Sequence, residues 1–267
     1  MSKPWNGVLT ATATPFKADL SIDYDKYAEH VSWLAANGTQ GVIPNGSLGE
    51  YQVLTQEERS KMVEVAMAAA PKGFNVVPGV AAYGAVESRR WAEHAQKAGA
   101  GAVMLLPPNA YRASDDEVIA HYKEVAKVGI PIVAYNNPFD TKVDLTPKLV
   151  SRIADEVPEV VAIKEFSGDV RRIWQIKRLA PRIEVIVADK LKHIAVEHVG
   201  SGLGDCVDGS RSVLAVARGN GAGLDLELLQ CVRERDRQVE VIERVVVRTA
   251  IHHVGHAVAL ATSHRDG

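Results

Sequence analysis

Residues 130–165 of the chain read IPIVAYNNPFDTKVDLTPKLVSRIADEVPEVVAIKE, and this stretch carries the pattern that decides the fold. Two short apolar runs, 131–135 and 160–164, flank an amphipathic segment that starts near Thr146. A short apolar run without polar alternation is typical of a parallel strand that is covered on both faces. The stretch therefore predicts a strand, a helix and a second strand.

The same unit repeats at a nearly fixed interval on both sides of this stretch. Apolar runs precede amphipathic segments seven times, with expected strands at 7–14, 41–44, 75–80, 102–106, 131–135, 160–164 and 183–188, and expected helices at 23–37, from 55, 85–98, 115–128, from 146, 169–179 and 191–199. Two of these helices begin with a capping box, Thr55 with Glu58 and Ser114 with Glu117.

Seven βα units predict an α/β fold, a closed (β/α)8 TIM barrel, with an atypical segment after about residue 200. A flavodoxin-like or Rossmann sheet is the alternative fold. We expect residues 1–218 to form the barrel, with an eighth strand between residues 196 and 214, and residues 219–267 to form a divergent C-terminal segment.

Composition excludes several classes of protein. The 267 residues include 31 basic and 33 acidic side chains, so there is no global field that would attract nucleic acid or anionic lipid. No apolar run approaches the roughly 18 residues of a membrane span, and residues 1–7 lack the pattern of a signal peptide. Cys206 and Cys231 are too few for a disulfide framework. We expect a cytoplasmic enzyme.

Two polar side chains stand at strand ends, where TIM barrels carry their chemistry. Lys164 closes the apolar run 160–163, and burial lowers the pKa of an amine so that it attacks carbonyl groups and forms a Schiff base. Tyr135 closes the preceding strand and is a candidate for proton transfer. The alternatives are a lysine that reaches solvent or pairs with Glu165, and a core tyrosine that bonds to backbone.

The loop after the second strand reads NGSLGE at residues 45–50. Its glycines allow a tight turn whose backbone N–H groups hold a carboxylate, with the Ser47 hydroxyl as relay or donor. A nucleophile elbow would need glycine where Asn45 stands, and a Walker A loop would need a following Gly-Lys-Ser/Thr.

Several motifs occur in the order and spacing of one known family: Thr14-Pro15-Phe16, the loop 46–50, the helix start at 54–59, Tyr135-Asn136-Asn137-Pro138 and Ile163-Lys164-Glu165. Over about residues 6–190 the chain resembles the dihydrodipicolinate synthase / N-acetylneuraminate lyase family. The resemblance implies a lyase or synthase that uses no metal and no cofactor beyond a Schiff base on Lys164. It also implies a homo-oligomer, a dimer or tetramer.

The resemblance further implies roles for single residues. Tyr135 would move the proton and Ser47 would link it to solvent or substrate. The backbone of Gly46, Ser47 and Leu48 would hold the carboxylate of pyruvate or another 2-oxo acid. Val207 would contact the same ligand from the eighth strand.

Departures from the family pattern bear on the second substrate. Asp140 stands where the synthases have a carboxylate-binding arginine, and Asn109-Ala110 stands where they have a tyrosine pair. A sugar-acid aldolase, a 2-keto-3-deoxy acid dehydratase or a deaminase-type member fits this pattern better than a lysine-biosynthetic synthase. The alternative function is a catalytically inactive or regulatory 2-oxo acid-binding barrel.

The end of the chain has a different composition. No proline follows Pro181, no aromatic residue follows Trp174 and no lysine follows Lys192. One hypothesis is a shifted reading frame that begins near residue 200. Three histidines at 252, 253 and 256 suggest a metal site, but no neighbouring carboxylate or thiol completes it, and we expect no metal.

Overall fold

The computed structural model describes residues 3–187, 195–196, 212–219, 224–235 and 238–249 of the chain. Compactness divides the chain into two units, Met1–Val185 and Ile186–Gly267. The predicted boundary at residue 218 stays a prediction. No helix in the described ranges is long and apolar enough to cross a membrane.

Seven strands, which begin in the first unit, lie next to one another in chain order. They are β1 (Leu9–Ala11), β2 (Gly41–Ile43), β3 (Asn75–Val76), β4 (Val103–Leu105), β5 (Ile132–Asn136), β6 (Val160–Glu165) and β7 (Glu184–Val187). Two sheets, β1-β2-β3 and β4-β5-β6-β7, are joined by a parallel bridge between Gly79 and Met104. A doubly wound sheet reverses its strand order near the middle, so the sequential order supports the predicted barrel over the flavodoxin-like alternative.

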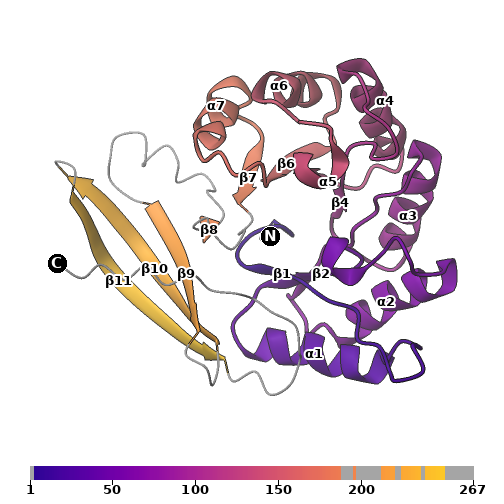
Figure 1. Ribbon diagram of the computed structural model, residues 1–267, viewed down its shortest axis with the longest axis horizontal. Helices are drawn as coiled ribbons and strands as arrows, with labels where there is room; N and C mark the ends of the chain where they lie inside the picture. The colour runs from indigo at the N-terminus through magenta and orange to yellow at the C-terminus, as the bar shows by residue number, and fades with distance from the viewer. Residues whose placement is uncertain (1–2, 188–194, 197–211, 220–223, 236–237, 250–267) are drawn as a thin grey trace. The chain divides into compact units, whose positions relative to one another are not determined.

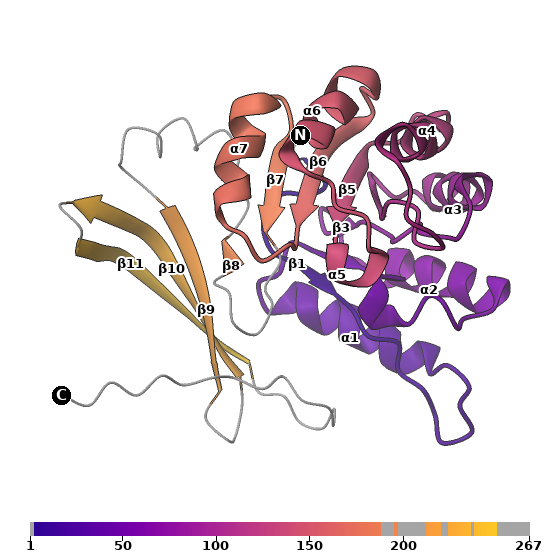
Figure 2. The same cartoon turned by 45° about the horizontal axis from the view of Figure 1, so that its top comes forward.

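Helices cover the outside of these strands (Figures 1 and 2). The long ones are α1 (Tyr24–Ala36), α2 (Gln56–Ala69), α3 (Ala85–Lys97), α4 (Asp115–Ala126), α6 (Pro147–Glu156) and α7 (Arg171–Leu179), and two short ones are η1 (Ser47–Gly49) and α5 (Pro138–Thr141). Both predicted capping boxes form, at Thr55 and at Ser114. Thr146 caps α6 through the Leu149 N–H.

The core lies on both faces of the strands, as their apolar composition predicts. All five residues of β5 are buried. Between the strands and the helices, Tyr27 and Val31 of α1 pack in one cluster with Val42 of β2 and Met62 of α2. Burial of a side chain of this size stabilises a fold by roughly 1.5–3 kcal/mol.

The second unit is built differently. Strands β8 (Ala195–Val196), β9 (Ser212–Gly219), β10 (Leu224–Arg235) and β11 (Gln238–Thr249) form an antiparallel sheet in the order β11-β10-β9-β8. The helix predicted over 191–199 is wrong at its described residues, because 195 and 196 pair with β9. Most of the expected eighth barrel strand, 196–214, lies outside the described residues.

Candidate active site

Lys164 and Tyr135 lie side by side at the ends of two neighbouring strands. They are register partners on β6 and β5, so their side chains project from the same face of the sheet. The Lys164 Nζ lies 4.1 Å from the centre of the Tyr135 ring. The arrangement brings together the two residues that the sequence singles out for a Schiff base and for proton transfer.

Burial changes the chemistry of the Lys164 amine. The side chain keeps some exposed area, but protein atoms crowd its amine and lower the pKa from 10.5 to about 8. Desolvation is the whole cause of this shift, so Glu165 does not act as the ion-pair partner that the alternative interpretation requires. A useful fraction of the amine is therefore neutral and nucleophilic near pH 7.

The pKa of the Tyr135 hydroxyl shifts in the opposite direction from that of the Lys164 amine. Burial, together with the nearby Asp140 carboxylate, raises its pKa to about 12. The Asn137 Nδ2 donates to this hydroxyl at 3.4 Å and to the Asp140 Oδ2 at 2.5 Å. The Phe166 ring packs on Tyr135 at 6.2 Å between centroids. The phenol thus stays protonated at neutral pH and can donate a proton beside a neutral amine.

The loop after β2 is held in a tight conformation. Asn45 and Glu50 adopt positive φ angles of 56° and 54°, and the Thr14 hydroxyl donates to the Gly49 carbonyl at 2.7 Å. A side chain at Gly79 would approach the Asn45 carbonyl oxygen to 2.3 Å, so the loop after β3 packs directly against this loop. The sequence marked Gly46 and Gly49 as important, but it gave no reason to single out Gly79.

The predicted carboxylate-binding residues share this loop. Gly46 and Ser47 are partly buried, whereas the Leu48 side chain is 65% exposed. Within residues 3–187, no hydrogen bond joins Ser47 to Tyr135 or to Lys164. The predicted relay from Ser47 to Tyr135 therefore remains a prediction.

A cavity of about 150 Å³ lies at the starts of α2 and α3. The Arg59 guanidinium is buried between the rings of Tyr51 and Trp91, at 5.0 and 4.3 Å from their centres, and burial lowers its pKa to about 10. Asn109, which departs from the expected tyrosine pair, donates to the Tyr51 hydroxyl at 3.1 Å. Neither Lys164 nor Tyr135 lines this cavity.

Other predicted site residues cannot be placed. Val207 and the histidines at 252, 253 and 256 lie outside the described residues. Where the structure does describe the chain, no three His, Cys, Asp or Glu side chains gather as metal ligands would.

Comparisons with known proteins agree with the motifs. The model of the dihydrodipicolinate synthetase family matches residues 4–200. The 4-hydroxy-tetrahydrodipicolinate synthase of Thermodesulfovibrio yellowstonii is 32% identical over 198 residues, 73% of this chain and 67% of that protein. The corresponding synthase of Anaplasma marginale (strain St. Maries) is 34% identical over 200 residues, 74% of this chain and 66% of that protein.

A solved structure gives the same result. YagE, a prophage protein of the dihydrodipicolinic acid synthase family from E. coli K12, in complex with pyruvate, superposes with a TM-score of 0.66 at 28% identity, over 69% of this chain and 63% of that one. The chain thus spans roughly two thirds of the length of these relatives.

Proposed function

Because the chain belongs to the dihydrodipicolinate synthetase family, we propose that it is a Schiff-base lyase or synthase acting on pyruvate or a related 2-oxo acid. The observation that carries the proposal is the desolvated Lys164 amine, with a pKa of about 8, beside a protonated tyrosine. The complex of YagE with pyruvate supports pyruvate as the first ligand to test.

Each chemical step has a group in the first unit to perform it. The neutral Lys164 amine attacks the ketone carbon, and Tyr135 protonates the departing hydroxyl so that water leaves and an iminium forms. The Tyr135 phenolate left by this step then takes a proton from the adjacent carbon, and the iminium accepts the released electron pair, as it also would if a carbon fragment left that carbon. The resulting enamine can attack an aldehyde. Water then releases the product from Lys164. No further cofactor is needed.

The loop after β2 is the proposed site of the 2-oxo acid carboxylate. We assign this role to the backbone of Gly46, Ser47 and Leu48, with the Ser47 hydroxyl as relay to Tyr135, and we place Val207 against the ligand. The tight turn that positive φ angles create at Asn45 and Glu50 supports the assignment, because such turns direct successive N–H groups to one point.

Asp140 bears on the second substrate. Its carboxylate raises the pKa of both Tyr135 and Tyr51, so its negative charge acts on both phenols. A second carboxylate at this position would be repelled, whereas hydroxyl or ammonium donors would be attracted. The reaction could be an aldol cleavage or condensation, a dehydration or a deamination. In each case, the negative charge of Asp140 favours a second substrate rich in hydroxyl groups, such as a sugar acid, over an aldehyde that carries a second carboxylate.

The protein is proposed to act in the cytoplasm as a dimer or tetramer.

Borohydride reduction in the presence of pyruvate, followed by peptide mass analysis, tests the proposal. We expect a reduced pyruvyl adduct on Lys164. Lys177 is a control within the same chain, because burial also lowers the pKa of its amine while its Nζ donates to the Ile183 carbonyl at 3.2 Å. Equal labelling of the two lysines would indicate unspecific reaction.

The same experiment separates the two candidate functions. Absence of an adduct with pyruvate and with a panel of 2-oxo acids would contradict the enzyme. A Lys164 adduct that forms without turnover of any of the second substrates named above would favour the inactive or regulatory barrel instead.

A further inference from the structure

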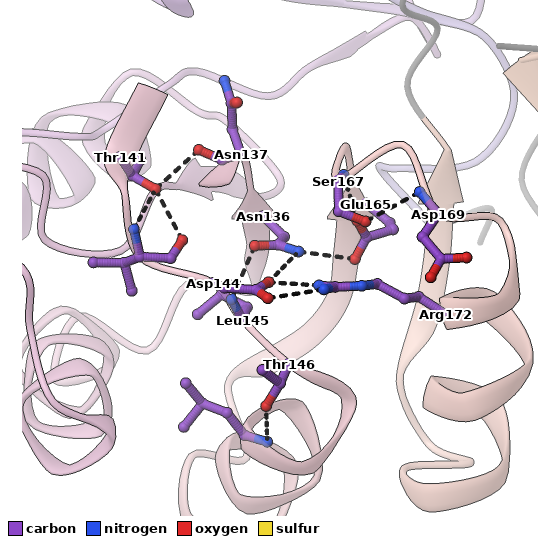
Figure 3. Close-up of polar contacts among 12 residues, drawn as sticks. Asn136, Asn137, Thr141, Asp144, Leu145, Thr146, Glu165, Ser167, Asp169 and Arg172 are labelled. Atoms are coloured by element: carbon purple, nitrogen blue, oxygen red, sulfur yellow. Dashed lines mark hydrogen bonds and ion pairs between the residues drawn. The ribbon is translucent and has the colours of Figure 1, made fainter. Parts of the chain in front are cut away.

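Asn136 joins the ends of two strands through its side chain (Figure 3). The residue is fully buried, and its Nδ2 donates to the Glu165 Oε2 at 3.0 Å and more weakly to the Asp144 Oδ1 at 3.4 Å. Its Oδ1 accepts the Leu145 N–H at 2.9 Å. One amide therefore connects β5 to β6 and to the segment that leads into α6.

Two charged groups extend this connection. The Glu165 Oε1 accepts the Ser167 N–H at 2.6 Å, which fixes the loop after β6. Asp144 receives two hydrogen bonds from Arg172 of α7, from Nη1 at 2.5 Å and from Nη2 at 2.8 Å. These bonds lower the pKa of Asp144 and keep it ionised. Asn136 and Glu165 are buried and Asp144 is partly exposed, and each carboxylate oxygen of this network accepts at least one hydrogen bond.

The network lies one residue beyond the candidate catalytic pair. Asn136 and Glu165 are register partners, and they directly follow the partners Tyr135 and Lys164. Because side chains alternate along a strand, the network occupies the opposite face, toward the helices, and leaves the reacting face free. The bridge that it forms holds the same two backbones that carry the amine and the phenol.

We propose that Asn136 and Glu165 are positioning residues, which hold the ends of β5 and β6 in the register that places Tyr135 against the Lys164 amine. The inference rests on the proposed Schiff-base function. The rate of adduct formation on Lys164 would then depend on a hydrogen-bond network that does not contact the substrate. The Ser167 bond strengthens this dependence, because it also fixes the loop of Phe166, whose ring packs on Tyr135.

The hydrogen-bonding groups of Asn136 and Glu165 explain why an amide and a carboxylate are needed at these two positions. Two donors, the Asn136 Nδ2 and the Ser167 N–H, face the two oxygens of Glu165. Glu165→Gln has the same shape but turns an NH2 group toward one of these donors. Asn136→Asp places a carboxylate oxygen against Glu165 and Asp144. The double variant Asn136→Asp, Glu165→Gln restores one donor and one acceptor across the strands.

The test is a rapid-quench experiment that measures pyruvyl adduct on Lys164 after borohydride at increasing times. The amplitude reports the fraction of folded protein, and the rate constant at saturating pyruvate reports the geometry of the pair. We expect each single variant to slow the rate constant by about 100-fold with little change in the pyruvate concentration for half-saturation, as a displacement of about 1 Å would do. The double variant should recover to within about tenfold of the parent chain.

Thr146→Ala is the matched control. It removes the cap of α6 in the same region and costs about 1 kcal/mol of stability, but it leaves the Asn136 and Glu165 contacts intact. Its amplitude should fall on heating while its rate constant stays that of the parent. If Glu165→Gln fails to fold, Arg172→Lys replaces it in the same test. This variant loses the paired hydrogen bonds to Asp144, and we expect its rate constant for adduct formation to fall about tenfold.

The outcomes are distinguishable. An adduct in the parent chain, together with single variants that change only the amplitude, would overturn the positioning role and leave the proposed function standing. No adduct in the parent chain would overturn both. Slowed rate constants in the single variants, with partial recovery in the double variant, would support the proposal.

Discussion

The two units of the chain use strands in opposite ways. In the first unit, short parallel strands alternate with helices, so every strand ends at the same edge. In the second unit, β10 and β11 are antiparallel strands of 12 residues each, so their ends fall at opposite edges. Only the first arrangement brings the carboxyl ends of successive strands together at one edge, and the described members of the proposed site all come from it.

The composition changes where the architecture changes. The family match ends at residue 200, and the segment without proline, lysine or aromatic residues covers nearly all of the second unit. The shifted reading frame remains a hypothesis. Sequencing the gene tests it, because an alternative frame should encode an eighth strand and helical extension typical of the family, and it fails if no frame does.

The largest expected effect comes from Lys164→Met in the first unit. The variant keeps a similar length but has no amine, so the pyruvyl adduct and all turnover should disappear. Because the buried ammonium is disfavoured, as its low pKa shows, the same change should raise the Tm. Mass analysis and thermal unfolding measure the two effects. Residual turnover would mean that the reaction does not depend on this lysine.

Tyr135→Phe should have the next largest effect. It keeps the ring that contacts the Lys164 amine and Phe166 but removes the hydroxyl. Loss of a positioned proton donor should slow adduct formation by about 10²- to 10⁴-fold, while the Tm changes little. Single-turnover kinetics measure the rate. A rate within threefold of the parent would assign proton transfer to another group.

The pH dependence should reflect the same two groups. The reactive form of Lys164 is neutral, and raising the pH through its pKa of about 8 increases that form. The rate of adduct formation should therefore rise about tenfold from pH 7 to pH 9 and then level off. Tyr135 keeps its proton throughout, because its pKa is about 12. A profile that falls between pH 7 and pH 9 would contradict both assignments.

The smallest expected effect tests the second unit. Leu228 of β10 pairs with Ala215 of β9 and Val245 of β11, and Leu228→Pro removes a ladder hydrogen bond in the middle of this sheet. We expect a change in the circular dichroism of β structure, but adduct formation on Lys164 within about twofold of the parent. Loss of the adduct would show that adduct formation on Lys164 needs this sheet.

Local chemistry made much of the first unit predictable. Apolar runs identified its strands, and Thr55 and Ser114 marked two helix starts that the structure confirms. The same local patterns failed at residues 195 and 196, where a predicted helix is replaced by β8. Short segments adopt the structure that their partners impose, and the pairing with β9 is such a case.

Side-chain contacts between strands could not be predicted from the sequence. The motif Tyr135-Asn136-Asn137-Pro138 was identified from its residues, but nothing in it reveals that Asn136 bonds to Glu165, 29 positions away. The same holds for Asp144 with Arg172 and for the aromatic pair around Arg59. These partners are set by the register between strands and by the packing of helices.

The sequence by itself determined which side chains stand at strand ends, because the length of an apolar run and the caps that follow it are local properties. It therefore identified Lys164 and Tyr135. Only the tertiary structure decided that these two residues are register partners, that the amine is desolvated enough to have a pKa of about 8, and that Asn136 and Glu165 hold them together. The reason is that register and burial depend on contacts between segments far apart in the chain.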